Sequence, residues 1–333
     1  MPIPSRNVTR REALKQTFFF SAALALGSKR SLVRAQDIAA TSRHFLMLGD
    51  WGAGSQSQAQ LAVAAGMKGY VGKLGITPEG ILSVGDNFYG LLAGGVQSPR
   101  WKTDFEDVYP ASVFPGPFWT TLGNHDYWSE PVGKFQAQLD YAAARPGTRW
   151  TMPAKWYRVD WPATNPLLTC LVVDTNIKKD AFFAECLSDA ERAQQLAWLK
   201  AELAKPRVAP WLVCMGHHPL YSNGRHGDSR ALIADFGTLF QKHGVDFYFC
   251  GHDHDLQHLE FARLRTSFVL SGGGGARLYD MKPSERGPYS EAVYGFTHLE
   301  VSPVKFIVRH LDPNQKQVHA FSKTRDGKIN VAA

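Results

Sequence analysis

Six short apolar runs recur along the chain and are separated by polar or helix-like stretches. They occupy residues 45–50, 81–86, 118–124, 167–176, 211–217 and 246–252. The runs are short and bounded by polar or glycine-containing segments, so they predict strands rather than buried helices. Polar residues do not alternate regularly with apolar ones inside them, and we therefore expect sheets that are mainly buried.

Three stretches between these runs place apolar residues at helical spacing. Residues 56–74 are rich in alanine, residues 228–243 end at Gly244, and residues 188–205 open with Ser188 and Glu191 in the spacing of a capping box. Strands that alternate with helices predict βαβ units and an α/β fold.

The C-terminal part of the chain has a different pattern. The apolar segments 296–302, 305–312 and 318–324 follow one another with short turns and no long helix between them. This pattern predicts an antiparallel meander that joins or covers a sheet. No linker composition divides the chain after its first forty residues, so we expect one domain over residues 41–333.

The formal net charge of +7 comes mostly from the N-terminus. Residues 1–35 hold seven Lys or Arg and one Glu, which leaves 30 basic and 29 acidic residues in the remainder. No basic stripe interleaved with aromatic residues remains, and we therefore expect no nucleic-acid partner.

Residues 1–35 have the pattern of a leader. Arg10 and Arg11 precede a short apolar run at residues 17–27, and Ala35 ends a small-residue cleavage pattern. The paired arginines are typical of a twin-arginine signal peptide, which predicts the twin-arginine export machinery as a partner and a periplasmic or secreted protein. The apolar run is too short for a stable membrane anchor after processing. Unchanged export after replacement of both arginines by lysine would refute this prediction.

Five of the apolar runs end in a glycine that is followed by a possible metal ligand. The pairs begin at Gly49, Gly85, Gly123, Gly216 and Gly251, and the residues that follow are Asp50, Asp86, Asn124 with His125, His217, and His252 with His254. Ligands bind at the carboxyl ends of strands in α/β sheets. A single polar residue at a strand end is a weak signal of a metal site. Five buried strand ends of this kind are costly, however, because their polar side chains need partners that a cation would supply. Carboxylate, amide and imidazole donors suit two hard or borderline ions that share one carboxylate.

The four cysteines contain no CxxC spacing, so a zinc–thiolate site is not expected.

The motifs GDWG, GDNFY, GNHD, GHHP and GHDH stand in the order and approximate spacing of the metallophosphoesterase superfamily. More specifically, the chain resembles the small, tartrate-resistant purple acid phosphatases from about His44 to Tyr279. The resemblance implies a four-layer αββα sandwich in which two mixed sheets are flanked by helices, with residues 41–333 as the catalytic domain.

Tyr89 strengthens the resemblance. Position 52 is a glycine where common metallophosphoesterases have a ligating histidine, and Tyr89 stands three residues after Asp86. A trivalent cation can hold a phenol as phenolate, although the pKa of a phenol in water is near 10. The resemblance implies one set of ligands for Fe(III), formed by Asp50, Asp86, Tyr89 and His254. It implies a second set for a divalent Fe, Zn or Mn ion, formed by Asp86, Asn124, His217 and His252.

The resemblance also assigns three histidines to the substrate, a small-molecule phosphate monoester. His125 and His226 would bind phosphate or protonate the leaving alcohol, and His218 would contact the substrate or line the pocket. The expected reaction is in-line attack of a hydroxide activated at a dinuclear Fe(III)–M(II) centre, with an acidic pH optimum. A phosphodiesterase or nucleotidase on the same site and a non-catalytic iron-binding relative remain alternatives. The glycine run at residues 272–275 lacks the spacing of a dinucleotide-binding loop.

Overall fold

The computed structural model describes residues 42–54, 57–127, 133–145, 147–177, 186–281 and 286–332. The predicted leader, residues 1–35, lies outside the described residues and stays a prediction. Residues Arg43–Ala333 form one compact unit. Within the described ranges, every helix is too short or too polar to cross a membrane.

The first sheet combines four parallel strands with the C-terminal meander. Its strand order is β15-β14-β13-β12-β1-β2-β3-β4. The strands from β1 to β4 are parallel, and β12 joins the antiparallel meander to the free edge of β1. The predicted meander is therefore confirmed. The bounds are β1 Arg43–Leu48, β2 Gly80–Ser83, β3 Phe118–Thr120, β4 Trp150–Thr151, β12 Phe296–Val301, β13 Lys305–Leu311, β14 Gln317–Thr324 and β15 Ile329–Val331.

The second sheet is also mixed. Its order is β11-β9-β10-β8-β7-β6-β5, in which β6, β7, β8 and β10 are parallel and the other three are antiparallel to their neighbours. All six predicted strands are present, and each ends before its run does because the residues at the end of the run form a loop. The bounds are β5 Tyr157–Trp161, β6 Leu168–Val172, β7 Trp211–Met215, β8 Phe247–Cys250, β9 Leu256–Leu259, β10 Ser267–Ser271 and β11 Tyr289–Glu291.

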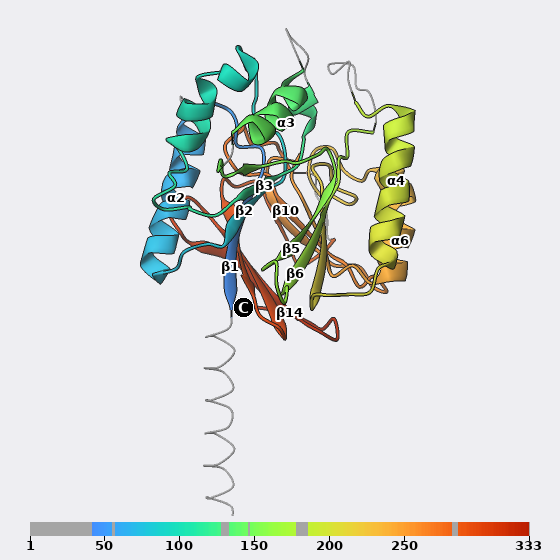
Figure 1. The fold of residues 1–333 in the computed structure, drawn as a ribbon. Coiled ribbons are helices and arrows are strands. Elements are labelled where there is room, and N and C mark those ends of the chain that lie inside the picture. Colours follow the sequence, from blue (N-terminus) through green and yellow to red (C-terminus); the bar gives the residue numbers. More distant parts are fainter. Residues whose placement is uncertain are drawn as a thin grey trace, which may run out of the picture. The chain divides into compact units, whose positions relative to one another are not determined.

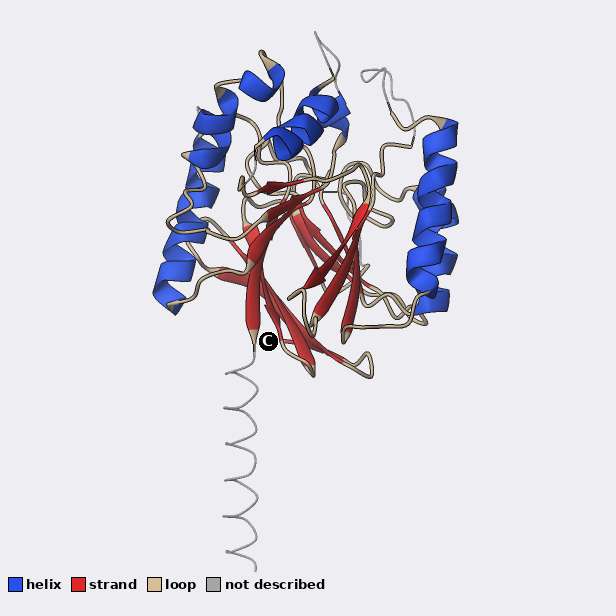
Figure 2. Ribbon diagram, in the orientation of Figure 1, coloured by secondary structure: helices blue, strands red, loops and turns tan. Residues whose placement is uncertain are grey.

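The two sheets pack face to face and helices cover their outer faces (Figure 1, Figure 2). Alternation along β1 shows how: Phe45 and Met47 point into the core between the sheets, whereas Leu46 and Leu48 pack against the helical layer. Helix α2 (Gln58–Leu74) covers the first sheet, while α4 (Asp189–Ala204) and α6 (Thr238–His243) cover the second. The four-layer αββα sandwich with two mixed sheets is thus confirmed. Helix α3 (Lys134–Ala144) packs beside the loop of η3 (Asn124–Tyr127).

The predicted capping box is present, and one predicted helix has an unexpected turn. The Ser188 side chain accepts from the backbone of Glu191, and the Glu191 side chain accepts from the backbone of Ser188. The stretch 228–243 contains α5 (Arg230–Leu232), the π-helix η4 (Ile233–Gly237) and α6. Its buried residues are spaced by four, namely Leu232, Phe236 and Phe240. A wider turn keeps residues with that spacing on one face better than 3.6 residues per turn does.

Buried histidines between the sheets predict acid sensitivity. His310 of β13 places Nε2 3.2 Å from the carbonyl oxygen of Gln257 on β9 of the other sheet. Burial lowers the pKa of His310 from 6.5 to about 3, and the neighbouring His319 adds to the shift. The unfolded chain then binds more protons between those two values, so the free energy of unfolding falls as the pH falls through that window.

We expect the midpoint of thermal unfolding to decrease from about pH 6.5 towards pH 3, the interval set by the pKa of His310. The slope should be shallower in His310→Gln, whose side chain stays neutral, and unchanged in His243→Gln at the end of α6. Scanning calorimetry across this range measures both slopes. Parallel curves for wild type and His310→Gln would contradict the assignment.

Candidate metal centre

The five glycine-containing loops meet at one end of the sandwich, where strands of both sheets end. Backbone hydrogen bonds tie them together: Asp50 N donates to Gly85 O at 3.0 Å, and Gly251 N donates to His217 O at 2.9 Å. Asp50, Asp86 and His252 have positive φ angles of 58°, 52° and 72°. Such left-handed backbone is uncommon for residues other than glycine and is often found at functional sites.

A first group of donor atoms surrounds the hydroxyl of Tyr89. This oxygen lies 3.0 Å from Asp86 Oδ2, 3.0 Å from His254 Nε2 and 3.3 Å from Asp50 Oδ1. Burial, and then the charges of Asp86 and Asp50, raise the pKa of Tyr89 well above 10. A phenolate here therefore needs a cation. The structure brings together the four residues predicted to hold Fe(III).

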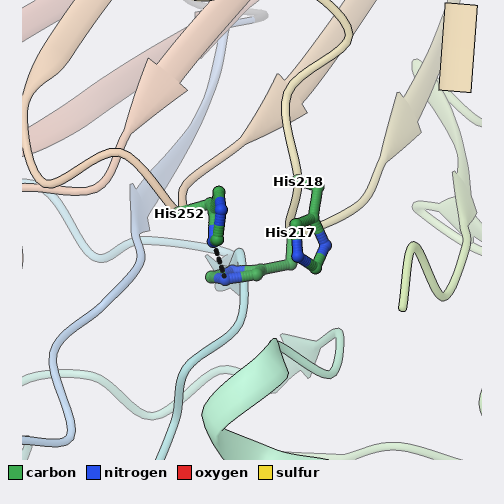
Figure 3. A group of neighbouring side chains, drawn as sticks. All are labelled: His217, His218 and His252. Carbon is green, nitrogen blue, oxygen red and sulfur yellow. Dashed lines mark hydrogen bonds between the residues drawn. The ribbon is translucent and has the colours of Figure 1, made fainter. Parts of the chain in front are cut away.

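A second group adjoins the first through Asp86. Asn124 Oδ1 lies 3.0 Å from His252 Nδ1 and 3.2 Å from His217 Nε2, and these two nitrogens are 3.3 Å apart (Figure 3). Asp86 Oδ1 is 3.5 Å from His217 Nε2. Asp86 therefore faces both groups with its two oxygens, as a carboxylate shared by two cations would.

Backbone carbonyls orient two of these imidazoles. Val84 O lies 2.8 Å from His217 Nδ1, and Arg277 O lies 2.6 Å from His254 Nδ1. A carbonyl can only accept, so each Nδ1 carries hydrogen, which leaves Nε2 of the neutral ring to offer its lone pair to a cation. Two carboxylates, a phenol, an amide oxygen and three imidazoles that converge in this way fit a pair of cations. Which ion each set holds stays a prediction.

The three predicted substrate histidines surround the same donor groups. His125 donates its backbone N–H to Asp86 Oδ1 at 2.9 Å, and its ring centre is 4.2 Å from that of Tyr89. The rings of His218 and His226 lie 4.2 and 4.1 Å from the ring of His252. Burial and the adjacent His217 lower the pKa of His218 to about 3, so its ring is neutral. All three are placed where a phosphate bound at the donor groups could meet them.

Two buried carboxylates position the loops and were not among the predicted site residues. Asp126 accepts hydrogen bonds from the backbone N–H groups of Asn87, Phe88 and Gly123 at 2.9 to 3.1 Å. Burial and the charge of Asp86 raise the pKa of Asp126 to about 6.

Asp253 acts on the loop of His226. Its Oδ1 accepts from the backbone N–H of His226 at 2.9 Å and lies 2.7 Å from Nδ1 of the same residue. Asp253 therefore holds both the main chain and the ring of His226.

Two cationic side chains hold the main chain on both sides of Tyr89. Lys134 of α3 donates to the carbonyls of Phe88 and Gly90, both at 2.7 Å. Arg100 donates to the carbonyls of Tyr89 and Leu91, also at 2.7 Å. Four successive carbonyls thus bind these cations alternately, which restricts the direction of the Tyr89 side chain. Sequence reasoning missed both, because a lone lysine or arginine in a polar stretch gives no signal of burial.

Comparisons with known proteins show what the chain is similar to. The family model described as calcineurin-like phosphoesterase matches residues 43–256. Human tartrate-resistant acid phosphatase type 5 is 30% identical over 85% of this chain and 91% of its own length. Purple acid phosphatase 3 of Arabidopsis thaliana is 30% identical over 84% of this chain and 77% of its own length. Among solved structures, GAP50, the anchor in the inner membrane complex of Plasmodium, has a similar fold, with a TM-score of 0.72, 24% identity and coverage of 88% of this chain and 90% of that one.

Proposed function

Because this chain belongs to the calcineurin-like phosphoesterase family, we propose that it is a purple acid phosphatase that hydrolyses small phosphate monoesters at an Fe(III)–M(II) pair. That it is a metal-dependent phosphoesterase follows from the family itself. The observation that carries the finer proposal is the position of Tyr89, whose hydroxyl lies within 3.3 Å of two carboxylates and an imidazole.

The residues fit two ions that share Asp86. Iron(III) would be held by Asp50, Asp86, Tyr89 and His254, and a divalent Fe, Zn or Mn ion by Asp86, Asn124, His217 and His252. Such a pair, when bound, supplies a water of lowered pKa and polarises the phosphoryl oxygens.

The surrounding histidines act on the substrate. His125 and the neutral His218 donate hydrogen bonds to phosphoryl oxygens, which stabilises charge as the bond to the alcohol breaks. His226 is held at Nδ1 by Asp253, so its Nε2 is the atom that gives a proton to the departing alkoxide. Asp253 holds the ring in the orientation for that transfer, as carboxylates do for catalytic histidines.

Tyr89→Phe tests the proposal, because it removes the phenolate and leaves an aromatic ring of the same shape. Metal-replete wild type should show a broad visible absorption band from phenolate and iron(III), and the band should be absent in Tyr89→Phe. Metal analysis by mass spectrometry should find iron in the wild type. Wild type without the band, with two other metals and full activity, would contradict the iron assignment.

Turnover of 4-nitrophenyl phosphate and of bis(4-nitrophenyl) phosphate distinguishes the remaining functions. We expect the monoester to be the better substrate by kcat/KM. A preference for the diester would favour a phosphodiesterase on the same site. Metal-replete purple protein with no turnover of either compound would favour a non-catalytic relative.

A further inference from the structure

We propose that Arg225, at the rim of this site, binds a second anionic group of the substrate. The inference rests on the proposed function, since it concerns the alcohol that the same site would release. It names a substrate class: phosphate monoesters whose alcohol carries a carboxylate or a second phosphate.

Arg225 lies one aromatic ring away from the donor groups. Its guanidinium carbon is 5.1 Å from the centre of the Tyr279 ring. That ring stacks on His254 with centres 4.1 Å apart, and meets His226 edge-on at 5.4 Å. Arg225 therefore stands beside the histidine that would protonate the alcohol. An anionic group on the alcohol would therefore lie on the same side of the site as the guanidinium of Arg225.

The loop that carries Arg225 is fixed on both sides of it. Arg286 donates to the carbonyl of Ser222 at 2.5 Å and to Asn223 Oδ1 at 3.0 Å, and pairs with Asp228 at 2.8 Å. After Arg225, the backbone of His226 is held by Asp253 as described above. The backbone is thus restrained while the Arg225 side chain is exposed. A positioned loop reduces the ordering cost of binding a ligand group.

The charge of Arg225 is not neutralised locally. In the part of the chain that the structure describes, no carboxylate forms an ion pair with Arg225 or with Arg277, another exposed arginine two residues before Tyr279. A guanidinium fork binds carboxylate and phosphate oxygens in pairs. Two such cations at the rim also attract anionic substrates from a distance, and this attraction weakens as the salt concentration rises. These positive charges favour a substrate whose alcohol carries an anionic group over one whose alcohol is neutral.

Two benzylphosphonates that resist hydrolysis test the subsite with metal-loaded full chain. One bears a para carboxylate, and the other a neutral para carboxamide of similar size. Calorimetry should give the carboxylate compound about fivefold tighter binding, the upper range for an exposed ion pair. High salt should reduce the preference. Arg225→Gln should abolish the preference and Arg225→Glu should reverse it, whereas Arg230→Gln, a control at an exposed arginine of α5, should retain it.

Equal binding of the two phosphonates to the wild type would overturn the subsite, as would an undiminished preference in Arg225→Gln. Turnover of phenyl phosphate, measured in parallel, reports separately on the proposed function. Protein that selects the carboxylate compound through Arg225 but does not hydrolyse phenyl phosphate would support the subsite and refute the phosphatase.

Discussion

Asparagine in place of Asp86 should lower kcat/KM for phenyl phosphate by more than the roughly 10- to 100-fold that loss of a residue orienting a metal ligand costs. Asp86 has Oδ2 3.0 Å from the Tyr89 hydroxyl and Oδ1 3.5 Å from His217 Nε2, so one change weakens both ion sites. His217 and His125 outweigh the effect of burial and lower the pKa of Asp86 to about 2, so the native side chain is an anion. Asparagine removes that charge. Mass spectrometry should find fewer than two metal ions per chain.

The Asp86→Asn variant should nevertheless fold. Asp86 has a φ of 52°, and asparagine tolerates this left-handed conformation as readily as aspartate does. Its amide oxygen can still accept the hydrogen bond from His125 N. Asp107→Asn is a matched control, because the Asp107 carboxylate is exposed and pairs with the exposed Lys102. Full metal content and activity in Asp86→Asn would contradict the shared-carboxylate arrangement.

The strands that hold the ligands were predictable because they are buried on both faces. A run such as residues 45–48 is apolar at every position, since β1 packs on the other sheet and on α2. The edge strands gave no such signal. β5 (Tyr157–Trp161) contains Arg158 and Asp160 and is half-buried, and β4 has only two residues. Their strand geometry depends on pairing with a neighbour, which a short stretch of sequence does not encode.

The candidate site divides in the same way. Five of the seven predicted ligands directly follow glycines at strand ends, Tyr89 and His254 come within four residues of such a glycine, and the order of those motifs is a signal along the chain. Asp126, Lys134 and Arg100 instead bind backbone N–H and carbonyl groups up to 48 residues away. Every residue offers the same backbone N–H and carbonyl groups, so the sequence does not show which residues these side chains bind. Their contacts with the Tyr89 loop could not be predicted from the pattern of residues. Tyr279 stacks on His254, and no motif along the chain marks this contact.

Gly123→Ala should abolish the metal centre although it adds a single methyl group. A Cβ at position 123 would lie 2.1 Å from Asp86 Oδ1 and 2.3 Å from Asp86 N, closer than real contacts allow. Asp86 is held by the Tyr89 hydroxyl and by His125 N, so it cannot withdraw without leaving both donor groups. The loss of stability should exceed the roughly 1–3 kcal/mol typical of overpacking, because the collision involves backbone. Calorimetry and metal analysis measure the two effects.

Gly72→Ala in α2 is the matched control for the added methyl group. Among the described residues, nothing beyond the adjoining residues and the helix's own backbone lies within 4 Å of a Cβ at position 72, and the residue is exposed in the last turn of the helix. Alanine there should raise the free energy of unfolding by about 0.5–1 kcal/mol, because it restricts the unfolded chain and suits a helix. The same added methyl group is therefore expected to lower the free energy of unfolding in Gly123→Ala and to raise it in Gly72→Ala. Gly123→Ala could keep its metals and the wild-type melting temperature only if position 123 lay farther from Asp86 than the 2.1 Å between its Cβ and Asp86 Oδ1 implies. That result would remove the geometric basis of the shared metal centre.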